Sequence, residues 1–284
     1  MTITIKRTAV GHEFFQTLVA PVVYFDHWAV RRFAEEREVQ DRFVRALHRA
    51  GGTLLVSLTN FGEFSAMTDR RQAVEAEEFL DRVLPSLYIA DFGADPGFLQ
   101  AQGRPGPRPE NLLFRQMAEE WDANGNRIST RTLIVNSVDQ RHIVQPAFQE
   151  LKTGVAAVVN AIRTDPVRVA FARMDRIAEG ATFRDVLQNA LLRDFMLDQN
   201  AAFSENDAMD FNHAMGACVS SDIVLLDASW VHKVREADRR LQAANATRHR
   251  LPRAFSQREI DMFLDALEAL QPNDGKQLPV LIRV

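Results

Sequence analysis

Short apolar runs that alternate with amphipathic stretches constrain the fold of this chain more than any other feature. Runs of strand type occur at residues 21–26, 53–58 and 87–91, and stretches with helical periodicity follow the first two. A fourth run, at 223–226, follows a helix-like segment that begins near Asn206. Alternating strands and helices are typical of a parallel sheet with helices packed on its faces. We therefore expect an α/β core.

The middle of the chain lacks this alternation. Gly and Pro are frequent at residues 93–109, which indicates a loop. A following segment, 132–138, fits a strand or a helix equally well. Beyond it the pattern is helical, and the expected breaks are at Gly154, Pro166 and Gly180.

These segments predict how the chain is organised. Residues 20–91 and 206–284 form the α/β core, and residues 92–205 form a mostly helical insertion or extension. Near the end of the chain, Ser256 and Glu259 form a capping box that begins a helix, and the last seven residues are a candidate strand. In the first half, one helix is expected from His27 to Ala50.

The composition is that of an ordinary globular protein, with 284 residues, 46% of them hydrophobic and 25% charged. The formal net charge of −4 excludes a global basic field for nucleic acid, although it leaves room for a local basic patch. Cys218 is the single cysteine, which excludes an intramolecular disulfide and a cysteine zinc cage. The N-terminus lacks an apolar signal core, and no apolar stretch is long enough to span a bilayer. We therefore expect a cytoplasmic protein that does not enter a membrane.

Four acidic residues occupy matching places in this pattern. Asp26 ends the first apolar run, and Asp227 ends the fourth. Glu63 is expected in the first turn of the helix after the second run, where Thr59 or Asn60 is the expected cap, and Asp210 lies near the start of the helix before the fourth run. The carboxyl ends of parallel strands meet at one edge of the sheet, where α/β folds bind ligands.

Each of these acids also has a structural interpretation, because an acid at a helix N-terminus caps the helix or gains from its dipole. Taken together, the four acids indicate a cation site, since crowded carboxylates raise one another's pKa unless a cation is present. Oxygen ligands without cysteine favour Mg²⁺ or Mn²⁺ over zinc. Such a metal positions a phosphate oxygen and lowers the pKa of a bound water, which supports hydrolysis of a phosphodiester.

Three other residues near these acids have structural interpretations as well as a possible role in the site. Asp207 fits helix capping better than metal binding and is kept as a reserve ligand, while Asp222 precedes its strand and is interpreted as structural. His27 follows the first acid directly, and either contacts phosphate or is a packed or solvated histidine.

The four acidic motifs resemble those of the PIN-domain family of metal-dependent ribonucleases. They are Val-Val-Tyr-Phe-Asp26, Leu-Leu-Val-Ser-Leu-Thr-Asn-Phe-Gly-Glu63, Asp210-Phe-Asn-His-Ala-Met-Gly-Ala-Cys and Ser-Asp-Ile-Val-Leu-Leu-Asp227. The resemblance covers roughly residues 20–91 and 206–245. It implies a three-layer α/β/α PIN-like sandwich around a central parallel sheet. It also implies an endoribonuclease in which Asp26, Glu63, Asp210 and Asp227 hold Mg²⁺ or Mn²⁺ and activate water.

The chain departs from the family pattern at two places. The family commonly has a small hydroxyl residue after the first acid and Thr before the fourth, whereas this chain has His27 and Leu226. Two alternatives therefore stay open beside the ribonuclease. One is a PIN-like binding or scaffold module with weak or no catalysis, and the other is a hydrolase of small phosphodiesters.

Several arginines follow the acids and are candidates for binding the RNA backbone. Arg31 follows the first acid, and Arg235 and Arg239 follow the fourth. Glu236 and Asp238 are interleaved with the latter pair, so a salt-bridged surface is the alternative. The resemblance further implies RNA as a partner, a toxin-type nuclease that an antitoxin or other protein neutralises, and a homodimer.

Overall fold

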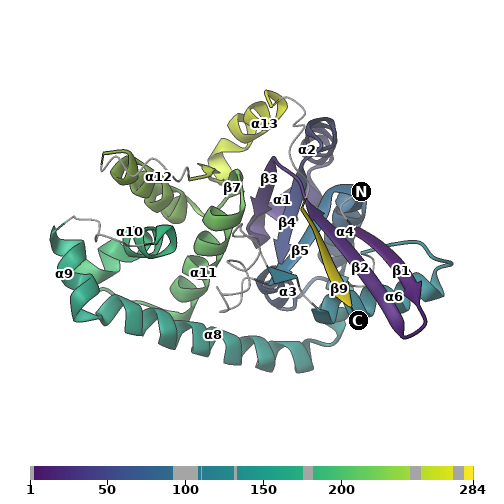
Figure 1. Cartoon of the computed structure of the whole chain (residues 1–284), viewed down its shortest axis with the longest axis horizontal. Helices are drawn as coiled ribbons and strands as arrows, with labels where there is room; N and C mark the ends of the chain where they lie inside the picture. Colours follow the sequence, from purple (N-terminus) through teal and green to yellow (C-terminus); the bar gives the residue numbers. More distant parts are fainter. Residues whose placement is uncertain are drawn as a thin grey trace.

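The computed structural model describes residues 3–91, 108–109, 111–130, 133–174, 182–243, 251–270 and 278–283. A six-stranded sheet in the order β6-β5-β4-β3-β7-β8 forms the centre of this part of the chain (Figure 1). Its five parallel strands are β3 (Val22–Phe25), β4 (Thr53–Ser57), β5 (Leu87–Asp91), β7 (Ile223–Leu225) and β8 (Arg253–Phe255). The antiparallel edge strand is β6 (Arg108–Pro109). The expected parallel α/β core is confirmed, and β8 is a strand that the sequence analysis did not predict.

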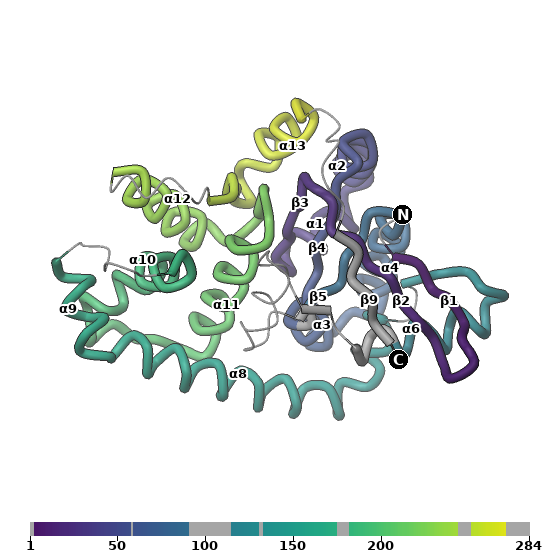
Figure 2. Tube along the Cα trace, in the orientation of Figure 1, coloured from purple at the N-terminus to yellow at the C-terminus, as the bar shows by residue number. Residues whose placement is uncertain are grey.

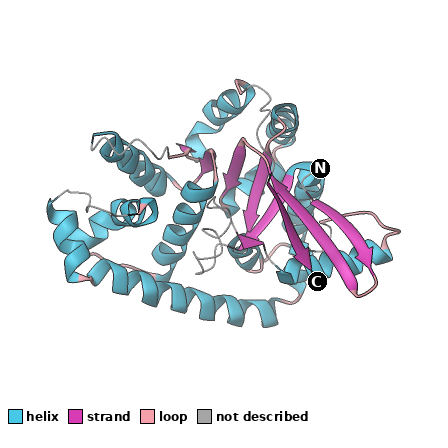
Figure 3. Cartoon of the chain, in the orientation of Figure 1, coloured by secondary structure: helices cyan, strands magenta, loops and turns pink. Residues whose placement is uncertain are grey.

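Helices cover both faces of this sheet (Figure 3). The residues of β3 and β4 are therefore buried on both sides. Val23 and Phe25 of β3 belong to one hydrophobic core and Tyr24 belongs to the other. The helices that contribute to the first core include α1 (His27–Glu35), α2 (Arg37–Ala50), α4 (Arg70–Val83) and α13 (Ile260–Glu268). The second core includes side chains of α10 (Phe183–Leu197), α11 (Glu205–Ser220) and α12 (Ala228–Ala243).

The described part of the middle region is helical apart from the short strand β6, and the expectation was of a mostly helical region. The ambiguous segment forms a helix, Gly154 lies inside a continuous helix rather than at a break, and Pro166 begins the next helix as predicted. Gly180 and most of the expected Gly- and Pro-rich loop lie outside the described residues. The helices are α6 (Asn111–Ala123), α7 (Leu133–Asp139), α8 (Arg141–Thr164) and α9 (Pro166–Met174). With 24 residues, α8 is the longest of the described elements, and the tube in Figure 2 shows its path.

These helices pack onto the same sheet as the core elements. Leu133 and Ile134 of α7 belong to the first hydrophobic core, while Leu187 and Leu191 of α10 belong to the second. No helix among the described residues is long and apolar enough to cross a membrane.

A second, antiparallel sheet contains β1 (Ile3–Thr8), β2 (Gly11–Leu18) and β9 (Leu278–Arg283). β9 confirms the expected terminal strand, whereas β1 and β2 were not predicted. The fully buried Gln16 of β2 joins this sheet to the parallel one, since its Nε2 donates to the carbonyl of Ile89 at 3.0 Å and its Oε1 accepts from the Ile89 N–H at 2.9 Å. The side-chain amide of Gln16 thus pairs with the backbone of Ile89 in β5 as a residue of a neighbouring strand would.

The helix expected over residues 27–50 is two helices, and this prediction was wrong. Glu36 separates α1 from α2 because its backbone is extended, with φ −101° and ψ 92°. The side chain of Gln40 donates back to the carbonyl of Phe33 at 3.0 Å and holds the two helices at this junction. Neither Gly nor Pro marks the break.

Five phenylalanines form the centre of the first core. Phe25 at the end of β3 lies 4.7 Å, centroid to centroid, from both Phe33 of α1 and Phe43 of α2. The rings of Phe79 in α4 and Phe263 in α13 complete the group. One strand residue therefore connects four helices.

We expect Phe25→Ala to lower the free energy of unfolding by about 3–5 kcal/mol, since it removes a fully buried ring at the centre of this group. Urea unfolding followed by circular dichroism measures the change. Val10→Ala is the control, because Val10 is 96% exposed and its loss is expected to cost less than about 0.5 kcal/mol. A similar small change for both variants would contradict this account of the core.

Candidate metal centre

Asp26 lies at the carboxyl end of the central strand β3. Its N–H donates to the carbonyl of Leu225 in β7 at 3.0 Å, which fixes the backbone against the neighbouring strand. Its side chain caps α1, because Oδ1 accepts from the N–H of His27 at 2.7 Å. The residue is 7% exposed, so the fold holds a carboxylate largely out of water.

Glu63 reaches the same place from α3 (Leu58–Phe64). It lies near the end of this helix rather than in its first turn, and the N-cap is Ser57 rather than Thr59 or Asn60, so both expectations were wrong. Asn60 instead accepts from the Ser57 N–H at 2.9 Å and donates to the carbonyl of Phe25 at 3.3 Å. This amide ties α3 to the end of β3 and so places Glu63 beside Asp26.

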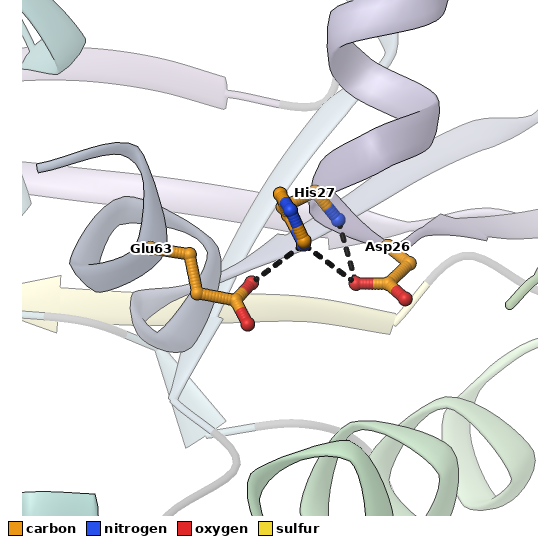
Figure 4. Close-up of side chains that lie close together, drawn as sticks. All are labelled: Asp26, His27 and Glu63. Carbon is orange, nitrogen blue, oxygen red and sulfur yellow. Dashed lines mark hydrogen bonds and ion pairs between the residues drawn. The ribbon is translucent and has the colours of Figure 1, made fainter. Parts of the chain in front are cut away.

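Two histidines lie against these carboxylates. The Nδ1 atom of His27 is 3.4 Å from Asp26 Oδ1 and 3.4 Å from Glu63 Oε2, and Figure 4 shows the ring between the two acids. On α11, Nε2 of His213 is 3.5 Å from the same Glu63 oxygen. The other ring nitrogen of His213 is hydrogen-bonded to the hydroxyl of Tyr24.

Asp210 and Asp227 belong to the same electrostatic cluster. Burial and the negative charges of Asp26 and Asp227 raise the pKa of Asp210 to about 6, although His213 and a hydrogen bond from Trp230 oppose the shift. Partial burial together with Asp26 and Glu63 also raises the pKa of Asp227, which lies at the exposed rim. The fold therefore brings Asp26 and Glu63 together, while Asp210 and Asp227 interact with them through charge but are not among the residues whose donor atoms converge.

The two histidines supply positive charge to this cluster. Although burial acts to lower the pKa of His213, Glu63, Asp26 and Asp210 raise it to about 9. Asp26 and Glu63 likewise raise the pKa of His27 against the effect of burial. In turn, burial acts to raise the pKa of Asp26, but hydrogen bonds and charge from the histidines hold it below its usual value. Sequence reasoning missed His213, for which its spacing of three residues from Asp210 was the available signal.

Three polar atoms at this place are buried and have no hydrogen-bond partner among the described residues. They are Nδ1 of His27, Oε2 of Glu63 and Nε2 of His213. Buried polar atoms are normally paired, so three such atoms facing one another call for a ligand between them. One donor atom each from Asp26, His27 and Glu63 lies within 4.8 Å of the other two, and carboxylate and imidazole groups are common metal ligands. These residues therefore fit a divalent cation.

The arginine candidates are not part of this centre. Arg235 and Arg239 line a pocket of about 510 Å³ between α12 and β8, together with Arg253 and Phe255. The guanidinium of Arg235 also forms an ion pair with Glu259, with 3.0 Å between Nη2 and Oε1, and Arg239 forms an ion pair with Glu236. Arg31 on α1 is 3.8 Å from Glu35, which is a surface pair on the same helix.

The remaining candidates have structural roles. Asp207 completes a capping box with Ser204 at the start of α11, as its interpretation as a helix cap predicted. Asp222 accepts from the N–H of Val22 at 2.7 Å at the opposite end of the strands. Cys218 is buried in the second core.

Comparison with known proteins does not assign this chain to a family. No family model matches it, and neither does any curated protein or solved structure.

We expect the stability of the metal-free protein to depend on His213 between pH 6.5 and 9. The pKa of this side chain rises from an ordinary 6.5 to about 9 on folding. Its contribution is therefore complete below pH 6.5 and is lost as the pH rises through about 9. Urea unfolding in EDTA at stepped pH measures the effect, and His213→Gln should remove this part of the decline. An equal decline in both proteins would show that the His213 charge does not contribute.

Proposed function

We propose that this chain is a divalent-metal-dependent endoribonuclease with a PIN-like fold, which uses Mg²⁺ or Mn²⁺ to hydrolyse RNA phosphodiester bonds. The observation that carries the proposal is the cluster of Asp26, His27 and Glu63, whose donor atoms converge at the carboxyl edge of the parallel sheet with buried polar atoms unpaired. This edge is where open α/β sheets bind their ligands. A protein antitoxin, a homodimer and a cytoplasmic location stay predictions.

Asp26 and Glu63 would hold the cation, with Asp210 and Asp227 completing the negative charge around it. When bound, the metal would supply Lewis-acid stabilisation of a phosphate oxygen and a lowered pKa for its water. The protein's contribution is to fix these ligands in advance. The hydrogen bond from the His27 N–H holds the Asp26 carboxylate at the start of α1. The Asn60 side chain holds α3, which carries Glu63, against the end of β3.

Asp210 is suited to take up a proton during the reaction. In the metal-free protein, burial and the negative charges of Asp26 and Asp227 bring the pKa of this carboxyl to about 6, so it takes up a proton more readily than an ordinary aspartate. Trp230 lies close enough to act against this rise in the pKa of Asp210. Asp227 lies at the exposed rim, where an incoming phosphodiester would first meet the cluster.

A track for the RNA backbone leads away from the acids along α12. Arg235 and Arg239 lie one turn apart on this helix, about 12 Å and 18 Å beyond Asp227 by the rise of an α-helix. Arg239 is 67% exposed, and its pair with Glu236 on the same helix is of a kind that stabilises proteins little. Its guanidinium can therefore turn to a phosphate at small cost.

The nuclease proposal is tested by cleavage of a pool of labelled single-stranded and structured RNAs in Mn²⁺, in Mg²⁺ and in EDTA. We expect Asp26→Asn and Asp210→Asn to lower metal-dependent cleavage at least about 100-fold, because each removes a charge from the metal site. Asp261→Asn is the control, since Asp261 is 92% exposed on α13 and lies outside the cluster. Unfolding curves establish that all variants fold.

The outcome separates the proposal from its alternatives. Equal cleavage by wild type and both site variants would reject the nuclease. Cleavage of a simple nitrophenyl phosphodiester but not of RNA would favour a small-phosphodiester hydrolase. Metal binding without cleavage of either would favour the scaffold module.

Arg239→Gln tests the proposed RNA track. We expect the KM for RNA to rise several-fold with kcat unchanged, and the slope of log affinity against log salt to fall by about 1, as for the loss of one phosphate contact. Fluorescence anisotropy with labelled RNA measures the slope. Arg37→Gln on α2 is the matched control, because Arg37 is 71% exposed and remote from the pocket. An unchanged slope for Arg239→Gln would place the RNA elsewhere.

A further inference from the structure

We propose that His27 is a metal ligand and that the centre therefore selects a first-row transition ion, from Mn²⁺ to Zn²⁺, over Mg²⁺. The inference rests on the proposed metal-dependent function and specifies its metal. From the sequence, His27 is either a phosphate contact or a packed or solvated histidine. The structure instead directs one of its ring nitrogens between two carboxylates (Figure 4).

The two distances from His27 to the carboxylates fit neighbouring ligands of one ion. Ligand atoms at about 2.0–2.2 Å from a metal lie ~3 to 3.5 Å apart when they are neighbours in the coordination shell. Nδ1 of His27 is 3.4 Å from Asp26 Oδ1 and 3.4 Å from Glu63 Oε2. A well-formed hydrogen bond would be shorter, and Nδ1 forms none with the described residues despite its burial.

A second, independent feature directs the Glu63 carboxylate toward this position. His213 is 1% exposed, and its unpaired Nε2 faces Glu63 Oε2 from the side of α11 at 3.5 Å. The Tyr24 hydroxyl binds the other ring nitrogen and so fixes the ring. His213 itself is not in the group whose donor atoms lie within 4.8 Å of one another, so we assign it as a positioning residue rather than a ligand. Partners of this outer kind orient metal ligands and tune affinity.

The donor set decides the class of metal. Mg²⁺ prefers oxygen ligands and retains several waters, so a site in which an imidazole nitrogen replaces one oxygen ligand binds Mg²⁺ less tightly. Zn²⁺, Fe²⁺ and neighbouring ions accept imidazole nitrogen readily, and three protein ligands with open positions are typical of catalytic sites. One nitrogen with two carboxylates is therefore a set for a transition ion.

The test measures nitrogen ligation directly on the whole chain loaded with one equivalent of Mn²⁺. Pulsed electron paramagnetic resonance should detect strong coupling to a directly bound ¹⁴N in the wild type. His27→Asn places an amide oxygen close to the position of Nδ1, so we expect this variant to fold and bind metal but to lose the coupling. Calorimetry should show its preference for Mn²⁺ over Mg²⁺ reduced on the order of tenfold or more.

Two control variants define the interpretation. His142→Asn changes an exposed histidine of α8 and should leave both readouts unchanged. His213→Gln should weaken Mn²⁺ binding but keep the nitrogen coupling, as a positioning residue requires. Absence of ¹⁴N coupling in the wild type, or its persistence in His27→Asn, would overturn the inference.

Failure of this inference is distinguishable from failure of the proposed function. RNA cleavage supported by an all-oxygen site would keep the nuclease and reject His27 as a ligand. Nitrogen-ligated Mn²⁺ without RNA cleavage would keep the ligand and reject the nuclease.

Discussion

The negative charge gathered at the carboxyl edge of the parallel sheet is the constraint that organises this protein. A buried carboxylate is costly unless a cation or hydrogen-bond donor faces it. Asp26 is nearly buried, and Glu63 has an oxygen that contacts two imidazole nitrogens but forms no hydrogen bond within the described residues. The histidines supply charge but leave three buried polar atoms unpaired, and a divalent cation held by Asp26, His27 and Glu63 would pair two of these atoms and balance the negative charge.

The topology explains how distant residues reach one point. β3 lies between β4 and β7, so the segments that leave these strands start side by side. Asn60 then binds the end of β3, and Tyr24 on that strand binds His213 of α11. Tyr24 faces the second core while its neighbour Phe25 faces the first, so a single strand supports both helical layers and the metal ligands. Stability and function therefore share the same few residues.

The sequence predicts the parallel strands well because they are buried on both faces and read as unbroken apolar runs. It does not predict β8, whose three residues begin with the exposed Arg253 and form no apolar run, or β2, whose buried Gln16 interrupts the apolar alternation. Asp26 and Asp227 could be selected because each directly follows an apolar strand, and Glu63 and Asp210 because each lies on a helix next to such a strand. His213 could not be assigned, since its partners Tyr24 and Glu63 come from distant parts of the chain and a histidine in an apolar helix is ordinarily a core residue. The position of the His27 ring between two acids could not be predicted, because Glu63 reaches it only when α3 packs against the end of β3.

Anomalous diffraction from crystals grown with Mn²⁺ tests the central claim most directly, because it locates the ion without reference to activity. The account predicts an anomalous peak at the carboxyl end of β3, within about 2.2 Å of donor atoms from Asp26, His27 and Glu63. A saturated crystal with no peak there, or with its strongest peak at another group of residues, would contradict the claim that this edge of the sheet is a metal centre.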